Sequence, residues 1–338
     1  MFKGRCIAVV IPAYRGEATI AAVIRGLPDL VDHVVVVDDA SPDGTSEVVV
    51  ALADPRVHLL RTTRNRGVGG AMKAGLREAL RLGVDIAVKM DADGQMRPEL
   101  LPDLLDPLCS ADYDYSKGNR FYDRQALASM PRLRLLGNVA SSFLTKLASG
   151  CWNVFDTQNG YLAMTAGLLR RLDIDRLAEG YFFENSLLIQ LNILDVPVVE
   201  VPMPARYGGE ISSLRPWRMV WQHPPRLLGG LLYRLWHKYF LMHTSPVALL
   251  LLCGWPMLLF GVAFGAYHWY VSIATGVPAT TGTVMLAVLP IVLGVQFLLE
   301  ALIMDASSAP KGPAIVRLGE EGVPDDTAAG AERERHEA

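Results

Sequence analysis

The chain has 338 residues, of which 51% are hydrophobic and 20% are charged, and its formal net charge is −3. This length suits about two domains, and the near-neutral charge gives no sign of a nucleic-acid partner. The mean hydropathy of +0.25 is high for a soluble enzyme. The excess lies late, because residues 246–304 contain a single charged side chain. A wholly soluble protein is therefore excluded.

The first part of the chain alternates between two kinds of pattern. Short apolar runs rich in β-branched residues are typical of strands buried on both faces of a sheet. Between them lie segments with helical periodicity and polar N-terminal residues. Strands are expected at residues 6–11, 34–37, 57–61 and 84–90, and helices at 17–27, 45–53 and 71–82. Such alternation predicts an α/β domain with a mostly parallel sheet.

Polar side chains stand at the carboxyl ends of all four expected strands. They are Tyr14, Asp39, Asn65 and Asp91. In open parallel sheets, ligands bind in the crevice beyond these strand ends. Four separate signals therefore converge on one predicted binding crevice.

A glycine-rich segment, residues 67–70, follows the third expected strand. It does not fit a dinucleotide fingerprint, because it follows the wrong strand and has no suitably placed ribose-binding acid after it. Two interpretations stay open. The glycines form a tight turn with a close helix approach, or their backbone N–H groups lie near a phosphate or ribose.

The turn Asp91-Ala92-Asp93 presents two carboxylates with one residue between them, directly after a strand. Carboxylate oxygens suit hard cations, and Mg²⁺ is usually held by one or two carboxylates together with substrate phosphates. Turns are rich in Asp for other reasons as well, so the motif gains its meaning from its neighbours. We expect it to hold a metal-bound nucleoside diphosphate.

Two segments have the composition of helices that lie at a membrane surface. Residues 130–152 combine helical apolar spacing with Arg132, Arg134 and Lys146, although a helix that covers the sheet would look the same. Residues 217–240 interleave Trp and Tyr with basic residues. Aromatic residues of this kind favour the membrane–water boundary, and hydrophobic segments follow at once, so the second segment is interpreted as interfacial.

Two later segments are long and apolar enough to cross a bilayer. They cover residues 246–270 and 277–304, and basic residues lie on both outer sides, which predicts a hairpin with both ends in the cytoplasm. Glu300 is interpreted as a boundary residue near the cytoplasmic end of the second span; the alternative is a bond across a helix or subunit interface. Residues 306–338 are expected to be disordered. The N-terminus lacks a signal-peptide pattern, and the four cysteines show no zinc or disulfide spacing.

Taken together, the motifs resemble family 2 glycosyltransferases of GT-A fold, and in particular dolichol-phosphate mannose synthases and bacterial polyprenyl-phosphate glycosyltransferases. The resemblance covers roughly residues 6–215 and rests on four motifs: Ile11-Pro12-Ala13-Tyr14, Val37-Asp38-Asp39-Ala40-Ser41-Pro42-Asp43-Gly44-Thr45, Asn65-x-Gly67-x-Gly69 and Asp91-Ala92-Asp93-Gly94-Gln95. It implies a GT-A catalytic domain over 1–215, an amphipathic juxtamembrane segment over 216–245, two transmembrane helices within 246–304 and a cytoplasmic tail over 305–338.

The resemblance also implies roles for particular side chains. The nucleotide-sugar donor would be bound by Pro12, Tyr14, Glu17, Asp39, Asn65 and Asp91. Mg²⁺ or Mn²⁺ would be held by Asp91, Asp93 and Gln95. The acceptor phosphate would be bound by Arg120, Arg206 and Arg215, of which Arg215 substitutes for a lysine that is common in the family. The catalytic residues would be Asp93 and Glu184, the latter as base or sugar-hydroxyl ligand.

The implied reaction transfers a hexose from a UDP- or GDP-linked donor to an undecaprenyl or dolichyl phosphate, with inversion. The enzyme would be a multi-pass protein of the bacterial inner membrane, with its catalytic domain and both termini in the cytoplasm. Related bacterial enzymes suggest a homo-tetramer. The alternative is a membrane glycosyltransferase that extends a saccharide or a lipid-linked oligosaccharide. The Gln-x-x-Arg-Trp signature of processive enzymes is absent, because Leu227 follows Arg226. A non-enzymatic scaffold and a transporter fit the motifs less well.

Overall fold

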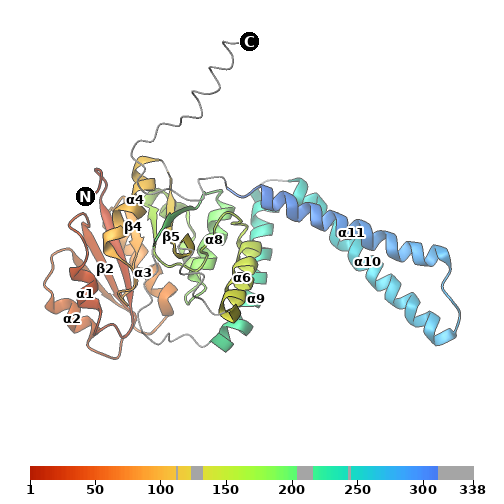
Figure 1. The fold of residues 1–338 in the computed structure, drawn as a ribbon, viewed down its shortest axis with the longest axis horizontal. Helices are drawn as coiled ribbons and strands as arrows, with labels where there is room; N and C mark the ends of the chain where they lie inside the picture. Colours follow the sequence, from red (N-terminus) through yellow and green to blue (C-terminus); the bar gives the residue numbers. More distant parts are fainter. Residues whose placement is uncertain (112, 123–131, 204–215, 243–244, 311–338) are drawn as a thin grey trace, which may run out of the picture.

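The computed structural model describes residues 1–111, 113–122, 132–203, 216–242 and 245–310 (Figure 1). The predicted acceptor arginines Arg206 and Arg215 therefore lie outside the described residues. So does most of the predicted C-terminal tail.

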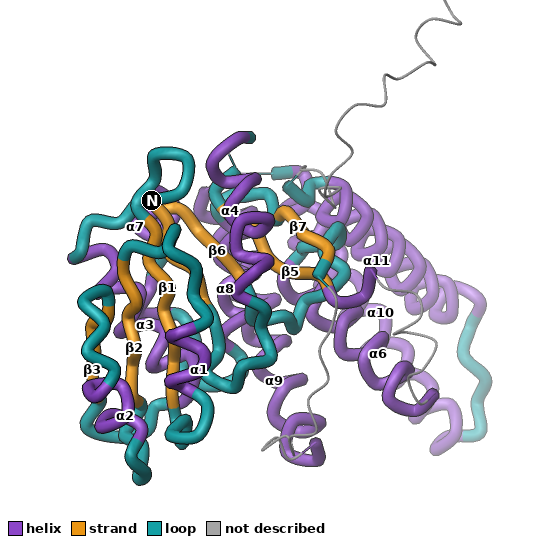
Figure 2. The backbone as a smooth tube through the Cα atoms, turned by 60° about the vertical axis from the view of Figure 1, so that its left-hand side comes forward, coloured by secondary structure: helices purple, strands orange, loops and turns teal. Residues whose placement is uncertain are grey.

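A seven-stranded sheet forms the centre of the described N-terminal part, in the order β3-β2-β1-β4-β6-β5-β7 (Figure 2). Only β6 runs antiparallel to its neighbours. This confirms the predicted mostly parallel α/β sheet. The strands are β1 (Ile7–Ala13), β2 (His33–Asp38), β3 (Val57–Arg61), β4 (Ile86–Lys89), β5 (Tyr115–Asn119), β6 (Leu162–Thr165) and β7 (Val199–Pro202).

Helices cover both faces of the sheet, because alternate strand residues point to opposite sides. In β1, Ile7, Val9 and Ile11 belong to one apolar core, and Ala8 and Val10 belong to the other. The first core lies under α1 (Ile20–Arg25), α2 (Thr45–Ala51) and α4 (Leu101–Ser110). The second lies under α3 (Gly67–Arg81), α7 (Ala166–Arg171) and α8 (Phe183–Ile193). Short 3₁₀ turns, η1 (Pro98–Leu100), η2 (Arg120–Tyr122) and η3 (Ile174–Arg176), connect these elements.

Two further helices pack beside α8 at the edge of this domain. They are α6 (Arg132–Ser149) and α9 (Pro216–Leu235), and α9 continues into a π-helical segment, η4 (Trp236–Met242). The predicted helix over residues 130–152 is thus confirmed as a helix. It packs against α8 and α9, although Phe143 and Leu144 on it are exposed.

The chain ends in a hairpin of two long apolar helices, α10 (Pro246–Thr275) and α11 (Thr281–Ser307), that extends away from the sheet (Figure 1). Small residues let the two backbones approach, since a Cβ on Gly294 would lie 2.7 Å from the backbone nitrogen of Leu258. Each helix contains a segment of mean hydropathy 2.3, of which only 22% and 17% is buried. So much exposed apolar surface needs a non-aqueous environment, and these two helices are long and apolar enough to cross a membrane.

The bounds of the two helices differ slightly from the predicted ones: α10 ends later, and α11 both begins and ends later. Helix α10 continues to Thr275 and stops at Gly276, whose φ of +68° is the left-handed conformation that ends helices. Helix α11 begins after Thr280, whose hydroxyl accepts the backbone N–H of Thr283. Glu300 is exposed on α11. It lies less than two helical turns before Asp305, which forms a buried ion pair with Arg234.

Candidate functional site

The polar positions predicted to share a crevice lie at one edge of the sheet. Strands β1 to β4 are parallel neighbours in the order β3-β2-β1-β4, so their carboxyl ends face the same side. Tyr14 follows β1, Asp39 follows β2, Asn65 follows β3 and Asp91 follows β4. The structure brings all four positions together as the strand pattern predicts.

The turn after β1 is fastened to the loop after β2. The Glu17 carboxylate accepts the backbone N–H of Gly44 at 3.1 Å. Pro12 is half-buried within β1, and the Tyr14 ring beyond it is 47% exposed. The guanidinium of Arg15 lies 5.4 Å from the centre of that ring. An exposed aromatic face beside a cation is a suitable surface for a planar base.

Asp39 connects the end of β2 to the start of α3. Its carboxylate is 2% exposed and accepts the backbone N–H groups of Arg66 (3.0 Å) and Gly67 (2.7 Å) and the hydroxyl of Thr62 (3.0 Å). Asn65 Oδ1 also accepts the N–H of Gly67, at 3.1 Å. Asp39 and Asn65, both predicted to bind the nucleotide-sugar donor, therefore accept backbone N–H groups at the N-terminus of α3. The negative charge of Asp39 is favourable there.

Close packing explains the glycine-rich segment. A Cβ on Gly69 would lie 2.0 Å from the backbone oxygen of Ala178, and the N–H of Gly70 donates to the backbone oxygen of Glu179 at 2.7 Å. The N–H of Gly67 is taken by Asp39 and Asn65. The structure thus favours the tight-turn interpretation over that of a phosphate cradle.

The acidic turn after β4 is exposed at its tip. Asp93 and Gln95 are exposed, and Asp93 Oδ1 accepts the backbone N–H of Gln95 at 2.9 Å. Gly94 between them has a φ of +73°. The Thr19 hydroxyl donates to the backbone oxygen of Ala92 at 2.6 Å and fixes the turn to the start of α1. Side-chain oxygens of the turn thus face solvent on a fixed backbone.

A buried lysine lies under the turn. Lys89, the last residue of β4, is 1% exposed, and its ammonium lies 2.6 Å from Asp91 Oδ1 and 3.4 Å from Glu184 Oε1. Burial by itself lowers the pKa of Lys89, but the two carboxylates outweigh it and raise the pKa above its ordinary value. Glu184 lies in the first turn of α8. The structure thereby joins the predicted donor side and the predicted base through one cation.

Arg120 forms a bidentate ion pair at the end of β5. Its Nε and Nη2 donate to the two oxygens of Asp156 at 2.7 Å and 2.9 Å, and its backbone N–H donates to the same carboxylate. Asp156 is fully buried, and its backbone N–H donates to the Glu200 carboxylate at 2.8 Å. A planar guanidinium held in this way has a fixed orientation.

The two buried carboxyl groups of this cluster have opposite pKa shifts. Burial would raise the pKa of Asp156, but the hydrogen bonds and charge of Arg120 lower it below its ordinary value. Burial raises the pKa of Glu200 despite two backbone N–H bonds to it. Burial likewise lowers the pKa of Lys117, which faces these carboxylates. Arg120 is therefore the main cation that keeps Asp156 ionised, because it adds hydrogen bonds to its charge.

This gives a prediction for acid stability. Because the folded-state pKa of Asp156 is lowered, its contribution is present above the unfolded-state pKa of about 3.8 and is lost as the pH falls further. Asp156→Asn should lower the free energy of unfolding by about 1–3 kcal/mol at pH 7. The difference from wild type should shrink below about pH 4. Denaturant unfolding at several pH values measures it, and a difference that stays constant down to pH 3 would contradict the prediction.

The side chains of the acidic turn suit a divalent metal whose remaining coordination positions are filled by a bound ligand. Asp91, Asp93 and Gln95 offer only oxygen ligands, the type that Mg²⁺ and Mn²⁺ prefer. Within the described residues, no group of three or more His, Cys, Asp or Glu side chains could hold a metal. A metal here would therefore be held by one or two carboxylates plus oxygens of a bound diphosphate, which is the usual arrangement for Mg²⁺.

The ion pairs of the site were missed by sequence reasoning. Nothing in the pattern around Lys89 distinguishes a buried cation in a strand from a polar strand end. The pairing of Arg120 with Asp156 links residues 36 positions apart in the sequence. A lysine next to an apolar strand is compatible with either arrangement, and only if it is buried must it find a carboxylate.

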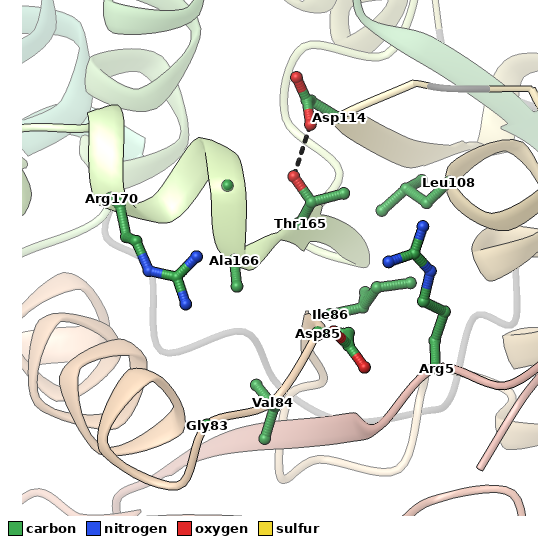
Figure 3. A pocket seen from close by; sticks show the side chains of 11 residues that line it. Arg5, Gly83, Val84, Asp85, Ile86, Leu108, Asp114, Thr165, Ala166 and Arg170 are labelled. Atoms are coloured by element: carbon green, nitrogen blue, oxygen red, sulfur yellow. Dashed lines mark hydrogen bonds between the residues drawn. The ribbon is translucent and has the colours of Figure 1, made fainter.

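A separate pocket lies at the opposite edge of the sheet (Figure 3). It has a volume of about 320 Å³ and lies beside the amino ends of β1 and β4, with Arg5, Asp85, Thr165 and Arg170 in its wall. Asp114 accepts the Thr165 hydroxyl at 2.6 Å. This edge is remote from the strand ends at which ligands bind in such sheets, so the pocket is distinct from the candidate site.

The chain is similar to several known proteins. A model of glycosyl transferase family 2 matches residues 8–173. An undecaprenyl-phosphate mannosyltransferase of Micrococcus luteus is 36% identical over 202 residues, which cover 58% of this chain and 82% of that protein. A polyprenol monophosphomannose synthase of Mycolicibacterium smegmatis is 33% identical over 203 residues, which cover 58% of this chain and 75% of that protein.

A solved structure has the same fold. Glucosyl-3-phosphoglycerate synthase from Mycobacterium tuberculosis in complex with UDP superposes with a TM-score of 0.53 and 27% sequence identity, over 68% of this chain and 80% of that chain. The same enzyme in complex with Mn²⁺, UDP-glucose and phosphoglyceric acid gives a TM-score of 0.51, with the same identity and shares. The catalytic part therefore has the GT-A fold, and the chain is a glycosyltransferase that belongs to glycosyl transferase family 2.

Proposed function

We propose that this protein is a membrane-bound, inverting glycosyltransferase that moves a hexose from a UDP- or GDP-linked donor to a polyprenyl phosphate. The product is a lipid-phospho-sugar on undecaprenyl or dolichyl phosphate. Two of the similar proteins carry such an activity in their names, one on undecaprenyl phosphate and one on polyprenol monophosphate. The side chains at the carboxyl edge of the sheet support the chemistry.

The donor would lie along the ends of β1, β2 and β4. Tyr14 offers an exposed ring for the base, while Asp39 and Asn65 hold the start of α3 at the floor of that crevice. The diphosphate would lie at the acidic turn with Asp91 and Asp93. A divalent metal bound there by Asp91, Asp93 and Gln95 would neutralise the negative charge that develops on the leaving diphosphate.

The acceptor would approach from the side of β5. A phosphate monoester has a second pKa near ~6, so at neutral pH it is already largely dianionic and nucleophilic without a strong base. What it needs is cationic positioning. Arg120 is fixed by Asp156 and 38% exposed, which suits it to orient a phosphate, with Arg206 and Arg215 as the further proposed arginines.

Glu184 lies between these two sides. Its carboxylate is 14% exposed and next to Lys89, where it would orient a sugar hydroxyl or take a proton. Two neighbouring polar atoms, Thr157 Oγ1 and Asn185 Nδ2, are buried without a partner within the described part of the chain. Leaving such a group unsatisfied costs about 1–3 kcal/mol. This side of the site is therefore suited to a polar ligand such as a sugar hydroxyl or a water molecule.

The membrane attachment is supported by α9 as well as by the hairpin. Leu228 and Leu232 of α9 and Trp236, the first residue of η4, form an exposed apolar stripe, while Leu227 and Arg234 face the protein. In Figure 1, α9 runs across the direction of α10 and α11. A helix with this orientation and an apolar outer face fits the membrane surface.

We therefore retain the proposed organisation. A catalytic domain (1–215), a juxtamembrane segment (216–245), two membrane spans (246–304) and a tail (305–338) would form a multi-pass protein of the bacterial inner membrane. The catalytic domain and both termini would be cytoplasmic, and four copies would form a homo-tetramer. Basic residues on both outer sides of the hairpin support this orientation.

The observation that carries the proposal is the direct connection between the sugar-transfer site and the apolar hairpin. The helix that supplies Glu184, α8, also supplies Asn192, whose side chain bonds Arg234 of α9 at 3.3 Å. Arg234 in turn pairs with Asp305 of α11 at 2.6 Å. A site fixed in this way to a membrane-spanning element is suited to an acceptor that itself resides in the membrane.

The test is an acceptor comparison with purified full-length protein in detergent. Radiolabelled UDP- and GDP-hexoses are supplied with Mg²⁺ or Mn²⁺, and with undecaprenyl phosphate, undecaprenol or a free saccharide. We expect label in the organic phase only with the phosphorylated lipid and with one class of donor. Transfer to the saccharide in place of the lipid phosphate would refute the proposal and favour saccharide extension.

A further inference from the structure

Lys89 is a charged residue in a position that strands of this kind fill with apolar side chains. The other residues of β4 are Ile86, Ala87 and Val88, all fully buried. Lys89 is 1% exposed and points toward the same face of the sheet as Ala87, the face covered by α8. Burying an ammonium group is costly unless it is paired. The partners of Lys89 must therefore offset the cost of burying its charge.

Both partners of Lys89 belong to the proposed catalytic site, and they come from different elements. Asp91 Oδ1, in the turn after β4, lies 2.6 Å from Nζ, and Glu184 Oε1, in the first turn of α8, lies 3.4 Å from it. Two carboxylates that share a site repel each other and disfavour their ionised forms. A cation between them removes this conflict and holds both in place through charge-assisted contacts.

The backbone around this cluster closes tightly. A Cβ on Gly160 would lie 2.4 Å from Lys89 Nζ, 3.2 Å from Asp91 Oδ2 and 3.4 Å from Glu184 Oε1. All three side chains of the cluster therefore meet at one point of the loop that follows Asp156. Only a glycine leaves room there for the ammonium.

We propose that Lys89 is a positioning residue for sugar transfer, which ties the donor-side carboxylate Asp91 to Glu184, the carboxylate between the donor and acceptor sides. The inference rests on the proposed function, because it concerns the same site. Lys89 acts through its two partners: it fixes how far apart the two carboxylates stand and how each is turned. A misplacement of about 1 Å in such an arrangement can lower the rate by about 100-fold.

The experiment compares kinetic constants of the full-length enzyme and its Lys89→Met variant, which keeps the length of the side chain and removes its charge. We expect kcat to fall about 100-fold, with a smaller change in the KM for the lipid acceptor. The matched control is Lys73→Met. Lys73 is also buried, but its ammonium donates to the backbone oxygens of Asp175 and Leu177, outside the site. This variant should lose stability and keep its kcat.

A double-mutant cycle separates positioning from a general effect on folding. Lys89 acts partly through Glu184. The fall in kcat that Lys89→Met causes should therefore be at least several-fold smaller in a Glu184→Gln background than in the wild type. The double variant also removes one charge of each sign, so it should fold even where Lys89→Met does not. Gly160→Ala is a third variant, which retains the ammonium but forces it aside, and it should lower kcat as well.

Two results would overturn the role of Lys89: an unchanged kcat in Lys89→Met, or an equal loss in both backgrounds. Failure of the proposed function looks different. If the wild-type enzyme transfers sugar to a saccharide and not to the lipid phosphate, the proposed acceptor is wrong. The Lys89 comparison is then made with the saccharide, and its outcome is read independently.

Discussion

Asp93→Ala is expected to abolish sugar transfer while leaving the protein folded. Asp93 lies at the exposed tip of the turn after β4, where its Oδ1 accepts the backbone N–H of Gln95 at 2.9 Å. Losing that hydrogen bond costs only about 0.5–1.5 kcal/mol of stability. In the proposed site Asp93 would help to hold a metal that neutralises the leaving diphosphate, so loss of its carboxylate would remove several kcal/mol of transition-state stabilisation. A fall in kcat of about 10³-fold or more follows.

Two further variants make this test specific. Asp93→Asn keeps an oxygen for the Gln95 N–H and removes the charge, so it should be nearly as inactive as Asp93→Ala. Asp175→Ala removes another exposed acid, which pairs with Arg77 of α3, and should keep full activity. Initial rates are measured over a range of Mn²⁺ and Mg²⁺ concentrations, with thermal unfolding in parallel. Metal-dependent activity retained in Asp93→Asn would remove this carboxylate from the metal site.

Asp305→Ala is expected to destabilise the protein by about 3–5 kcal/mol, because it leaves a buried guanidinium without its counter-ion. Asp305 lies at the end of α11 and accepts both Nη1 (2.6 Å) and Nη2 (2.9 Å) of Arg234, which is fully buried. Tyr239 donates to the same carboxylate at 2.6 Å. Arg234 also donates to the backbone oxygens of Leu147 and Ala148 at the end of α6.

A double substitution that removes both charges supplies the control for this ion pair. Removing both charges in Arg234→Met/Asp305→Ala leaves no uncompensated charge, so the double variant should be more stable than Asp305→Ala alone. Unfolding of the full-length protein in detergent is followed by circular dichroism. Equal midpoints for Asp305→Ala and wild type would mean that the pair does not hold the hairpin to the catalytic domain.

The sequence predicts the first half of the fold well for a physical reason. Strands β1 to β4 are short runs of apolar, mostly β-branched residues, and the residues that follow them are turn formers, so both pattern and boundaries are visible locally. The crevice follows from topology, because parallel strands must end at one edge. The two long apolar helices are also predictable from the sequence, because a run of about 20 apolar residues is typical of a helix that crosses a bilayer.

The second half of the sheet was not predicted, because its strands lack that local signal. Strand β5 reads Tyr-Ser-Lys-Gly-Asn, and its residues are buried through pairing with β6 and β7 rather than through apolarity. Strands β6 and β7 are four residues each. Their places depend on contacts between segments far apart in the chain, as the pairing of Ser116 with Val199 illustrates.

The ion pairs of the site escaped prediction for the same reason. Lys89 and Glu184 are 95 positions apart, and Arg234 and Asp305 are 71 apart. Each residue taken alone looks like an ordinary polar side chain. Only the folded chain shows that these charges are buried, and that burial makes their partners obligatory.

The mass of the lipid after reaction tests the proposed sugar transfer most directly. Undecaprenyl phosphate is incubated with the full-length enzyme, a divalent metal and the accepted nucleotide hexose, and the lipid is analysed by mass spectrometry. We expect the lipid phosphate to gain one hexose, with one nucleoside diphosphate released for each lipid converted. An unchanged lipid phosphate, together with a hexose gained by a saccharide acceptor, would contradict it.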